Sequence, residues 1–160
     1  MDLSIYITTQ GMDRLQRRIN DLLGERPEVI KAVAIAREFG DLSENAEYKA
    51  AKERQRAIDS EIDFLRRKAA TLKVIDPSVL PKDAVRFGSA CRTVDQNTSE
   101  ELSFKIVGAH ELNFYEDEQV LQVVSVVSPI GKGLLGKKIN EVALIQAPMG
   151  ERHLRILEIM

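Results

Sequence analysis

Three carboxylates lie close together in the segment FGDLSENAEY, residues 39–48, and their spacing allows either helix capping or metal chemistry. Asp41 and Glu44 are three residues apart, as in a capping box, where an N-cap oxygen and a first-turn carboxylate bond reciprocally to backbone amides. Ser43 is a rival N-cap, with Glu47 in the following turn. Because capping is the common use of these residue types, the segment alone favours capping over chemistry.

Apolar residues on both sides of this segment recur in alternating steps of three and four, a pattern typical of coiled coils. Each series has one polar exception, Arg26 or Gln55: the first is Met12, Leu15, Ile19, Leu22, Arg26, Val29, Val33 and Ala36, and the second is Tyr48, Ala51, Gln55, Ile58, Ile62, Leu65, Ala69 and Leu72. The two series mirror each other about residue 42, so that position 36 faces 48 and position 12 faces 72. The pattern predicts an antiparallel helical hairpin with a first arm, residues 11–39, roughly 43 Å long.

One proline interrupts the first arm of this hairpin. Pro27 lacks a backbone donor and clashes with the preceding turn, and Gly24 nearby weakens the helix further. We therefore expect a kink or a local break near Arg26.

The predicted hairpin places the acidic segment at its tip, where there is no core to fill. Two carboxylates at a tip cannot enclose a substrate or exclude water alone. Mg²⁺, however, is commonly held by one or two protein carboxylates, with waters and substrate phosphates as the other ligands. Asp41 and Glu44 therefore suit a half-site that another protein completes, and Leu42 is an apolar residue beside them.

After Leu72 the helical period gives way to short β-branched runs separated by turn residues. The runs are residues 85–94, 102–108, 120–127, 142–147 and 153–159. Residues 128–138 predict one short helix, with Ser128 as N-cap and Pro129 at its first position. The fold class is therefore α+β: a coiled-coil hairpin over residues 1–75 with its acidic tip at 40–48, a linker over 76–84, and a small, mostly antiparallel sheet domain over 85–160.

The composition limits the other possible functions. Aromatic residues make up 5% of the chain and Trp is absent, which argues against a deep aromatic pocket. The net charge of −2 divides into +1 for residues 1–75 and −3 for residues 76–160, so neither half has the basic excess of a duplex-binding domain. The single cysteine, Cys91, excludes an internal disulfide, and neither a signal peptide nor a membrane span is expected, so a cytoplasmic protein is predicted.

Two segments resemble the signatures of a known family. AREFGDLSENAEYKAAKERQ, residues 36–55, resembles the signature of the bacterial Gre transcript cleavage factors, the A type in particular, and SPIGKGLLGKK, residues 128–138, resembles the second signature of that family. The resemblance covers essentially the whole chain. It implies that the second domain is FKBP-like and docks on bacterial RNA polymerase at the rim of its secondary channel.

The resemblance also implies a function. The coiled coil of a Gre factor enters the secondary channel, and the polymerase's own active site then hydrolyses the backtracked RNA near its 3′ end by two-metal chemistry. A Gre factor is a cofactor of this reaction and not an independent nuclease. We expect a monomer, because a hairpin that pairs with itself needs no partner helix, and we expect no metal to be held stably by the isolated protein.

The site residues of the family carry over position by position. Asp41 and Glu44 match acidic tip residues that help to hold the second catalytic Mg²⁺ and to orient a water. Leu42, Ser43 and Asn45 make up the rest of the tip.

Other matched positions have simpler alternatives. Arg37 and Lys52 match basic positions that face the RNA, and a solvated coiled-coil flank is an equal interpretation of both. Tyr48 is expected to close the seam of the hairpin and not to contact substrate. Ser128 and Pro129 match the polymerase-docking loop, although ordinary helix capping explains the same residues.

The sheet domain departs from the family pattern at two places. Asn140-Glu141 stands where the family has Gly-Asp, and residues 116–127 form a longer and more acidic stretch than usual. Both departures bear on contacts with the polymerase and leave the tip chemistry unchanged.

Three functions compete at this stage. The first is a polymerase-dependent cleavage factor, which the presence of both Asp41 and Glu44 favours. The second is a Gre-like inhibitor that blocks the channel without stimulating cleavage. The third is an FKBP-like prolyl isomerase or chaperone, which needs an aromatic pocket. The second half supplies only four aromatic residues for such a pocket, Phe87, Phe104, Phe114 and Tyr115.

Overall fold

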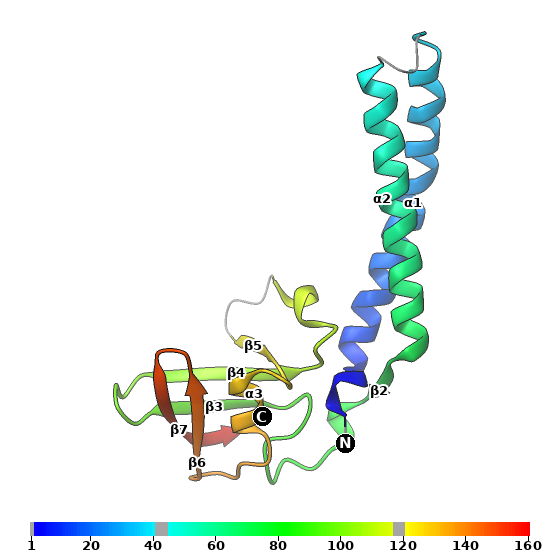
Figure 1. Ribbon diagram of the computed structural model, residues 1–160. Coiled ribbons are helices and arrows are strands. Elements are labelled where there is room, and N and C mark those ends of the chain that lie inside the picture. Colours follow the sequence, from blue (N-terminus) through cyan, green and yellow to red (C-terminus); the bar gives the residue numbers. More distant parts are fainter. Residues whose placement is uncertain (1, 41–44, 117–120) are drawn as a thin grey trace. The chain divides into compact units, whose positions relative to one another are not determined.

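The computed structural model describes residues 2–40, 45–116 and 121–160 (Figure 1). Asp41, Leu42, Ser43 and Glu44 lie outside the described residues. The chain divides into two compact units, one made of Asp13–Thr71 and the other of Met1–Met12 together with Leu72–Met160.

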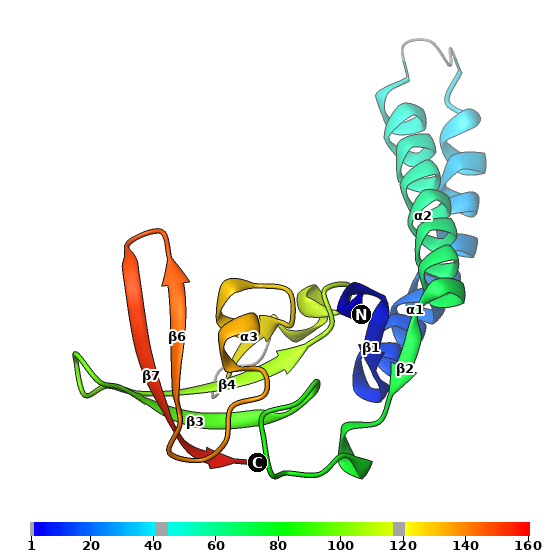
Figure 2. The same ribbon diagram turned by 60° about the horizontal axis from the view of Figure 1, so that its bottom comes forward.

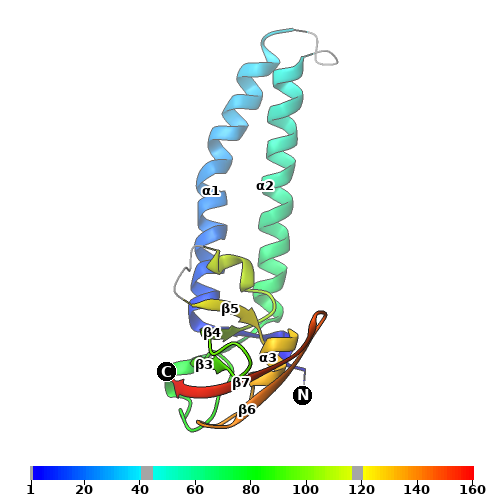
Figure 3. The same cartoon turned by 90° about the vertical axis from the view of Figure 1, so that its left-hand side faces the viewer.

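The first unit is the predicted helical hairpin. Helix α1, Thr9–Arg37, and helix α2, Ala46–Thr71, lie side by side and run in opposite directions (Figures 1 and 3). The buried apolar residues of this unit all come from the two predicted series: Leu15, Ile19, Leu22, Val33, Ala36, Ile58, Ile62 and Leu65. The hairpin and its seam are therefore confirmed.

Ion pairs cross between the two helices beside this seam. Arg18 donates to both carboxylate oxygens of Glu61, at 2.9 and 3.0 Å. Two further pairs, Arg26–Asp59 and Arg54–Glu25, have shortest N–O distances of 2.6 Å. These side chains are partly exposed, so each pair contributes at most about 1 kcal/mol to stability. Their main effect is on the alignment of the helices, since each arginine has its acid on the opposite helix.

Helix α1 continues as an α-helix on both sides of Pro27, so there is no local break near Arg26, and a kink there stays a prediction. Pro27 is exposed, so the lost backbone bond lies on the outer face of the helix. On the inner face, Leu22 and Val33 are buried on either side of the proline. We infer that this packing offsets the roughly 3 kcal/mol that a proline costs inside a helix.

The second unit contains a five-stranded sheet with the order β5-β4-β3-β7-β6 (Figure 2). The strands are β3 at Ala90–Asp95, β4 at Glu101–Val107, β5 at Gln122–Ser125, β6 at Val142–Ala147 and β7 at Gly150–Ile159. All neighbours are antiparallel except β4 and β5, which are parallel. The five predicted strands are present, although β3 begins five residues later than expected, after a turn at Gly88 with φ +82°.

Helix α3, Pro129–Leu134, packs against both edge strands, β5 and β6, so the sheet curls around it (Figure 2). The helix is shorter than predicted, because the chain leaves it at Leu135 and Gly136 has φ +85°. The core of this unit consists of Val85, Phe87, Cys91, Phe104, Ile106, Val124, Val126, Leu134, Ala143, Ile145, Leu154 and Ile156.

The first residues of the chain belong to the sheet unit and not to the hairpin, which corrects the predicted boundary. Strand β1, Tyr6–Thr8, pairs in parallel with β2, Lys73–Ile75 (Figure 2). Each strand has only three residues, too few for the alternation of apolar and polar residues to stand out in the sequence. The predicted linker begins beside β2 and includes one 3₁₀ turn, Pro77–Val79, capped by the side chain of Asp76.

A fully buried acid, Glu111, joins the start of α1 to the sheet unit. Its side chain accepts hydrogen bonds from the backbone amides of Thr8, at 2.8 Å, and Gly108, at 2.9 Å, and from the hydroxyl of Tyr115, at 2.8 Å. It also accepts from the Thr8 hydroxyl. A Cβ at Gly11 would collide with this side chain, so the first turn of α1 needs glycine there.

Glu111→Ala should destabilise the protein, because two backbone amides and two hydroxyls would lose their acceptor inside the fold. We expect the free energy of unfolding to fall by about 3 kcal/mol or more, measured by urea denaturation. Glu100→Ala, at an exposed position of the same unit, is the control and should change stability by less than about 0.5 kcal/mol. Equal effects of the two substitutions would contradict the structural role of Glu111.

Candidate functional site

The described residues on either side of the tip show how α2 begins. The helix starts at Ala46, and the side-chain oxygen of Asn45 accepts a hydrogen bond from the backbone amide of Tyr48 at 3.0 Å. This is the geometry of an N-cap, so the N-cap of α2 is Asn45. The prediction that Asp41 or Ser43 caps this helix is therefore wrong.

The position of the cap weakens the interpretation of Asp41 and Glu44 as helix-capping residues. A capping box would place its carboxylate at Tyr48, the third helical position, where there is none. Asp41 and Glu44 precede the cap and are not needed to start α2. Their own placement lies outside the described residues, so their role as a metal-binding pair stays a prediction.

Asn45 also bonds to the other helix. Its side-chain nitrogen donates to the backbone oxygen of Ala36, in the last turn of α1, at 2.6 Å. The same carbonyl accepts from the amide of Phe39 at 3.2 Å. One side chain therefore links the end of α1 to the start of α2, directly beside the predicted site.

Basic side chains gather around Tyr48. The guanidinium carbon of Arg37 lies 5.7 Å from the centre of the Tyr48 ring, within the range of a cation–π contact. The pKa of Tyr48 is lowered from its ordinary value, first by a hydrogen bond from Arg37 and then by the charges of Arg37, Lys52 and Arg56. The structure thus brings Arg37 and Lys52 to the same side chain, and Tyr48 is half-buried and not a fully enclosed seam residue.

The predicted docking loop lies at the start of α3. The hydroxyl of Ser128 accepts from the amide of Gly131 at 3.0 Å and donates to the backbone oxygen of Ser125 at 2.6 Å, and Pro129 is the first helical residue. The predicted cap is confirmed, and the docking role stays a prediction.

A shallow apolar hollow lies beside this loop, and we call it the α3 patch. Its lining consists of Val127, Pro129, Lys132, Gly133, Leu144 and Gln146. Val127 is 40% exposed and Leu144 is 48% exposed, although both are large and apolar. Exposed apolar side chains that gather beside a polar rim are typical of protein-binding surfaces.

Comparison with known proteins identifies the family. Residues 5–74 match the family described as "Transcription elongation factor, N-terminal", and residues 80–160 match the one described as "Transcription elongation factor, GreA/GreB, C-term". The chain belongs to the GreA/GreB family. The resemblance found in residues 36–55 and 128–138 is thereby confirmed.

Named relatives of this Gre factor are of the A type. It is 42% identical over 149 residues to the transcription elongation factor GreA of Rhodospirillum rubrum, covering 92% of each chain. It is 40% identical over 156 residues to GreA of Thermodesulfovibrio yellowstonii, covering 97% of this chain and 96% of the relative. Among solved structures, GreA factor homolog 1 of Thermus thermophilus is similar over 98% of this chain and 99% of its own, with 24% identity and a TM-score of 0.43.

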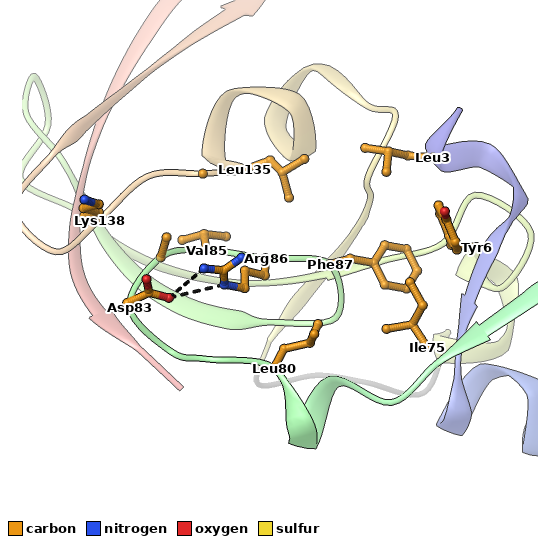
Figure 4. Close-up of a pocket in the computed structure, with 12 residues that line it drawn as sticks. Leu3, Tyr6, Ile75, Leu80, Asp83, Val85, Arg86, Phe87, Leu135 and Lys138 are labelled. Carbon is orange, nitrogen blue, oxygen red and sulfur yellow. Dashed lines mark hydrogen bonds and ion pairs between the residues drawn. The ribbon is translucent and has the colours of Figure 1, made fainter. Parts of the chain in front are cut away.

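A second pocket of this Gre factor, about 670 Å³ in volume, lies within the sheet unit (Figure 4). It is lined by Leu3, Tyr6, Ile75, Leu80, Asp83, Ala84, Val85, Arg86, Phe87, Leu135, Gly136 and Lys138. Asp83 and Arg86 pair with each other at 2.9 Å, and this hydrogen bond lowers the pKa of Asp83. Of the four aromatic residues that the second half offers, this pocket contains only Phe87, which packs beside Tyr6, while Phe104 and Tyr115 are buried and do not line it.

Residues 2–40, 45–116 and 121–160 contain no group of three or more His, Cys, Asp or Glu side chains placed to hold a metal ion. No helix in these ranges has both the length and the apolar character needed to cross a membrane.

Cys91 lies in β3 and is fully buried, and burial raises the pKa of its thiol from 9.0 to about 11. In the unfolded chain the thiol loses its proton near pH 9, while in the folded chain it keeps it. Stability should therefore fall as the pH rises from 9 to 11, by about 1.4 kcal/mol per pH unit at the steepest point.

The measurement that checks this is the difference in free energy of unfolding between the wild type and Cys91→Ala across this pH range. The variant lacks only this thiol, so the titration of every other group cancels in the difference. A difference that stays constant with pH would contradict the raised pKa of Cys91.

Proposed function

We propose that this Gre factor binds bacterial RNA polymerase, inserts the hairpin tip through the secondary channel and stimulates the hydrolysis of backtracked RNA near its 3′ end. The observation that carries this proposal is the N-cap of α2. Because Asn45 caps the helix, Asp41 and Glu44 have no capping duty that would account for them. Two carboxylates free of that duty, in a family of transcription elongation factors, are suited to act on the transcript.

The proposed ligand of the two carboxylates is the second catalytic Mg²⁺ of the polymerase. Carboxylate oxygens are the hard ligands that this ion prefers, and one or two of them suffice where waters and phosphates supply the rest. When bound, such an ion stabilises charge on the oxygens of an in-line displacement. The part of this chain is to present Asp41 and Glu44 and to orient a water, and the polymerase supplies the remaining ligands.

The basic side chains around Tyr48 fit the same proposal. Arg37 ends α1, and Lys52 lies in the second turn of α2. RNA carries one negative charge per phosphate, and Lys and Arg are the residues that bind it. We assign Arg37 and Lys52 to the backtracked RNA. Tyr48 holds Arg37 in place through the cation–π contact.

The sheet unit supplies the docking surface in this proposal. The α3 patch combines exposed apolar side chains with Lys132 and Gln146. Such a combination of apolar centre and polar rim is suited to a protein partner, and it includes Pro129 of the predicted docking loop. Ser128 supports the patch by capping α3.

Asp41→Ala and Glu44→Ala should each abolish stimulated cleavage while leaving the affinity for polymerase nearly unchanged. The reason is that each substitution removes a metal ligand and leaves the docking unit intact. The measurement is the shortening of RNA in stalled, backtracked bacterial polymerase, together with binding of the labelled factor to the polymerase.

Glu47→Ala is the matched control, since Glu47 is an exposed carboxylate in the first turn of α2. It should retain cleavage. Normal cleavage by the Asp41 and Glu44 variants would overturn the proposed chemistry. A wild-type protein that binds the polymerase but gives no shortened RNA would identify a channel inhibitor instead.

Leu144→Glu should weaken binding to the polymerase by at least about 10-fold, because it places a charge in the middle of the apolar α3 patch. The side chain is half-exposed, so stability should change little. Val79→Glu is the control: Val79 lies in the same unit, is 75% exposed and is not part of the patch. Equal binding by both variants would show that the polymerase docks elsewhere.

A further inference from the structure

The pocket of the sheet unit is built by three separate segments of the chain (Figure 4). Leu3 and Tyr6 come from the first residues, Ile75 and Leu80 from β2 and the 3₁₀ turn that follows it, and Leu135 from the end of α3. Each of these five apolar side chains is only partly buried, although each lines the pocket. Partly buried apolar side chains that gather around one hollow are typical of a site for a small ligand.

Backbone hydrogen bonds hold the walls of this pocket in place. The amide of Val85 donates to the backbone oxygen of Lys137 at 2.8 Å, and the amide of Gly136 donates to the backbone oxygen of Val85 at 2.7 Å. Strand β1 pairs with β2, which joins the first residues to the start of the linker. The rings of Tyr6 and Phe87 meet edge to face, with their centres 6.1 Å apart. The hollow is therefore preformed, and a ligand would need little rearrangement of the chain to enter it.

Charged side chains gather at one end of the pocket. Figure 4 shows Asp83, Arg86 and Lys138 toward this end and Tyr6 at the opposite end. Asp83 and Arg86 pair with each other at 2.9 Å, so their charges largely cancel. Among the described residues, the Lys138 ammonium has no carboxylate in an ion pair with it. Glu141 accepts from the backbone amide of Lys138, at 3.0 Å, and does not line the pocket. This end of the pocket therefore carries one positive charge that its own lining does not neutralise.

We propose that this pocket binds a small amphipathic monoanion, namely a carboxylate on an apolar chain of the fatty-acid kind. The apolar chain lies against Leu3, Tyr6 and Ile75, and the carboxylate meets Lys138. One unneutralised positive charge matches one negative charge, whereas a dianion would also face the repulsion of Asp83. The volume of about 670 Å³ is typical of a site for a small molecule.

The proposed ligand site is separate from the surfaces described above. It shares no lining residue with the α3 patch, and it contains neither Asp41 nor Glu44. Binding of the anion therefore does not depend on the proposed role in transcript cleavage. We expect the isolated full-length chain to bind it without polymerase or Mg²⁺.

Three ligands with the same ten-carbon chain and different charges test the proposal. Decanoate is the anion, 1-decanol the neutral analogue and decyltrimethylammonium the cation. In an NMR titration of the full-length chain, decanoate should shift the backbone amides of residues 84–87 and 135–138 along one saturable curve. The alcohol should bind about 5-fold more weakly, the fold-change expected for one partly exposed ion pair. The cation should show no saturable binding.

Lys138→Gln tests the site of the carboxylate. It should weaken decanoate binding about 5-fold, to the level of 1-decanol, and leave the affinity for the alcohol unchanged. Lys82→Gln is the matched control, because Lys82 is an exposed lysine of the same unit that does not line the pocket. It removes the same charge and should keep the wild-type affinity for decanoate.

Leu80→Glu tests the site of the apolar chain. It places a carboxylate in the apolar wall and should remove saturable binding of both decanoate and the alcohol. Val79→Glu is the control, because Val79 is the neighbouring residue, is 75% exposed and lies outside the lining. Amide shifts of the hairpin and of β6 and β7 report whether each variant is folded, and Lys138→Gln decides the test if Leu80→Glu is not.

Three results would overturn the proposal. The first is that decanoate shows no saturable binding to the wild type. The second is that the anion, the alcohol and the cation bind equally well, or that Lys138→Gln and Lys82→Gln affect decanoate equally. The third is that the shifted amides lie around the α3 patch and not around this pocket.

Discussion

The antiparallel alignment of α1 with α2 is the constraint on which the rest of the hairpin depends. Its apolar layers, such as Leu22 in α1 with Ile62 in α2, are buried only when the two mirrored series face each other. A shift of one helix along the other would move whole layers out of contact, since side chains in such a seam interlock in discrete positions. The packing of the seam therefore sets the distance between the end of α1 at Arg37 and the start of α2 at Ala46, which the connecting segment has to span.

Polar contacts then select this alignment from the alternatives that apolar packing alone allows. One apolar layer can pack against several others, because the layers are alike. The pairs Arg18–Glu61 and Arg26–Asp59 form in only one alignment of the helices. These pairs add little stability at the surface, but a shifted alignment would leave their charges without partners. Near the tip, a hydrogen bond from the side chain of Asn45 to the backbone oxygen of Ala36 is a further polar contact between the two arms that depends on their alignment.

The sequence predicts the features that repeat, and it misses several of those that occur once. Sixteen positions at coiled-coil spacing are enough to identify the seam and its fold-back point, as the burial of Leu15, Val33 and Ile62 shows. The strand pair β1–β2 has three residues on each side and no period to detect. Glu111 was missed for a similar reason, because a buried acid cannot be told from an exposed one until its donors are in place.

The N-cap of α2 shows how one such detail changes a functional conclusion. Asp41, Ser43 and Asn45 are all residue types that favour the cap, so the sequence alone cannot choose among them. The choice falls on Asn45 because the same side chain also reaches the backbone carbonyl of Ala36 in the last turn of α1, a bond that needs a donor. The amide group thus meets two backbone requirements with one residue. The N-cap and the proposed metal ligands are therefore different residues of the acidic segment, so the capping interpretation and the proposed chemistry do not compete.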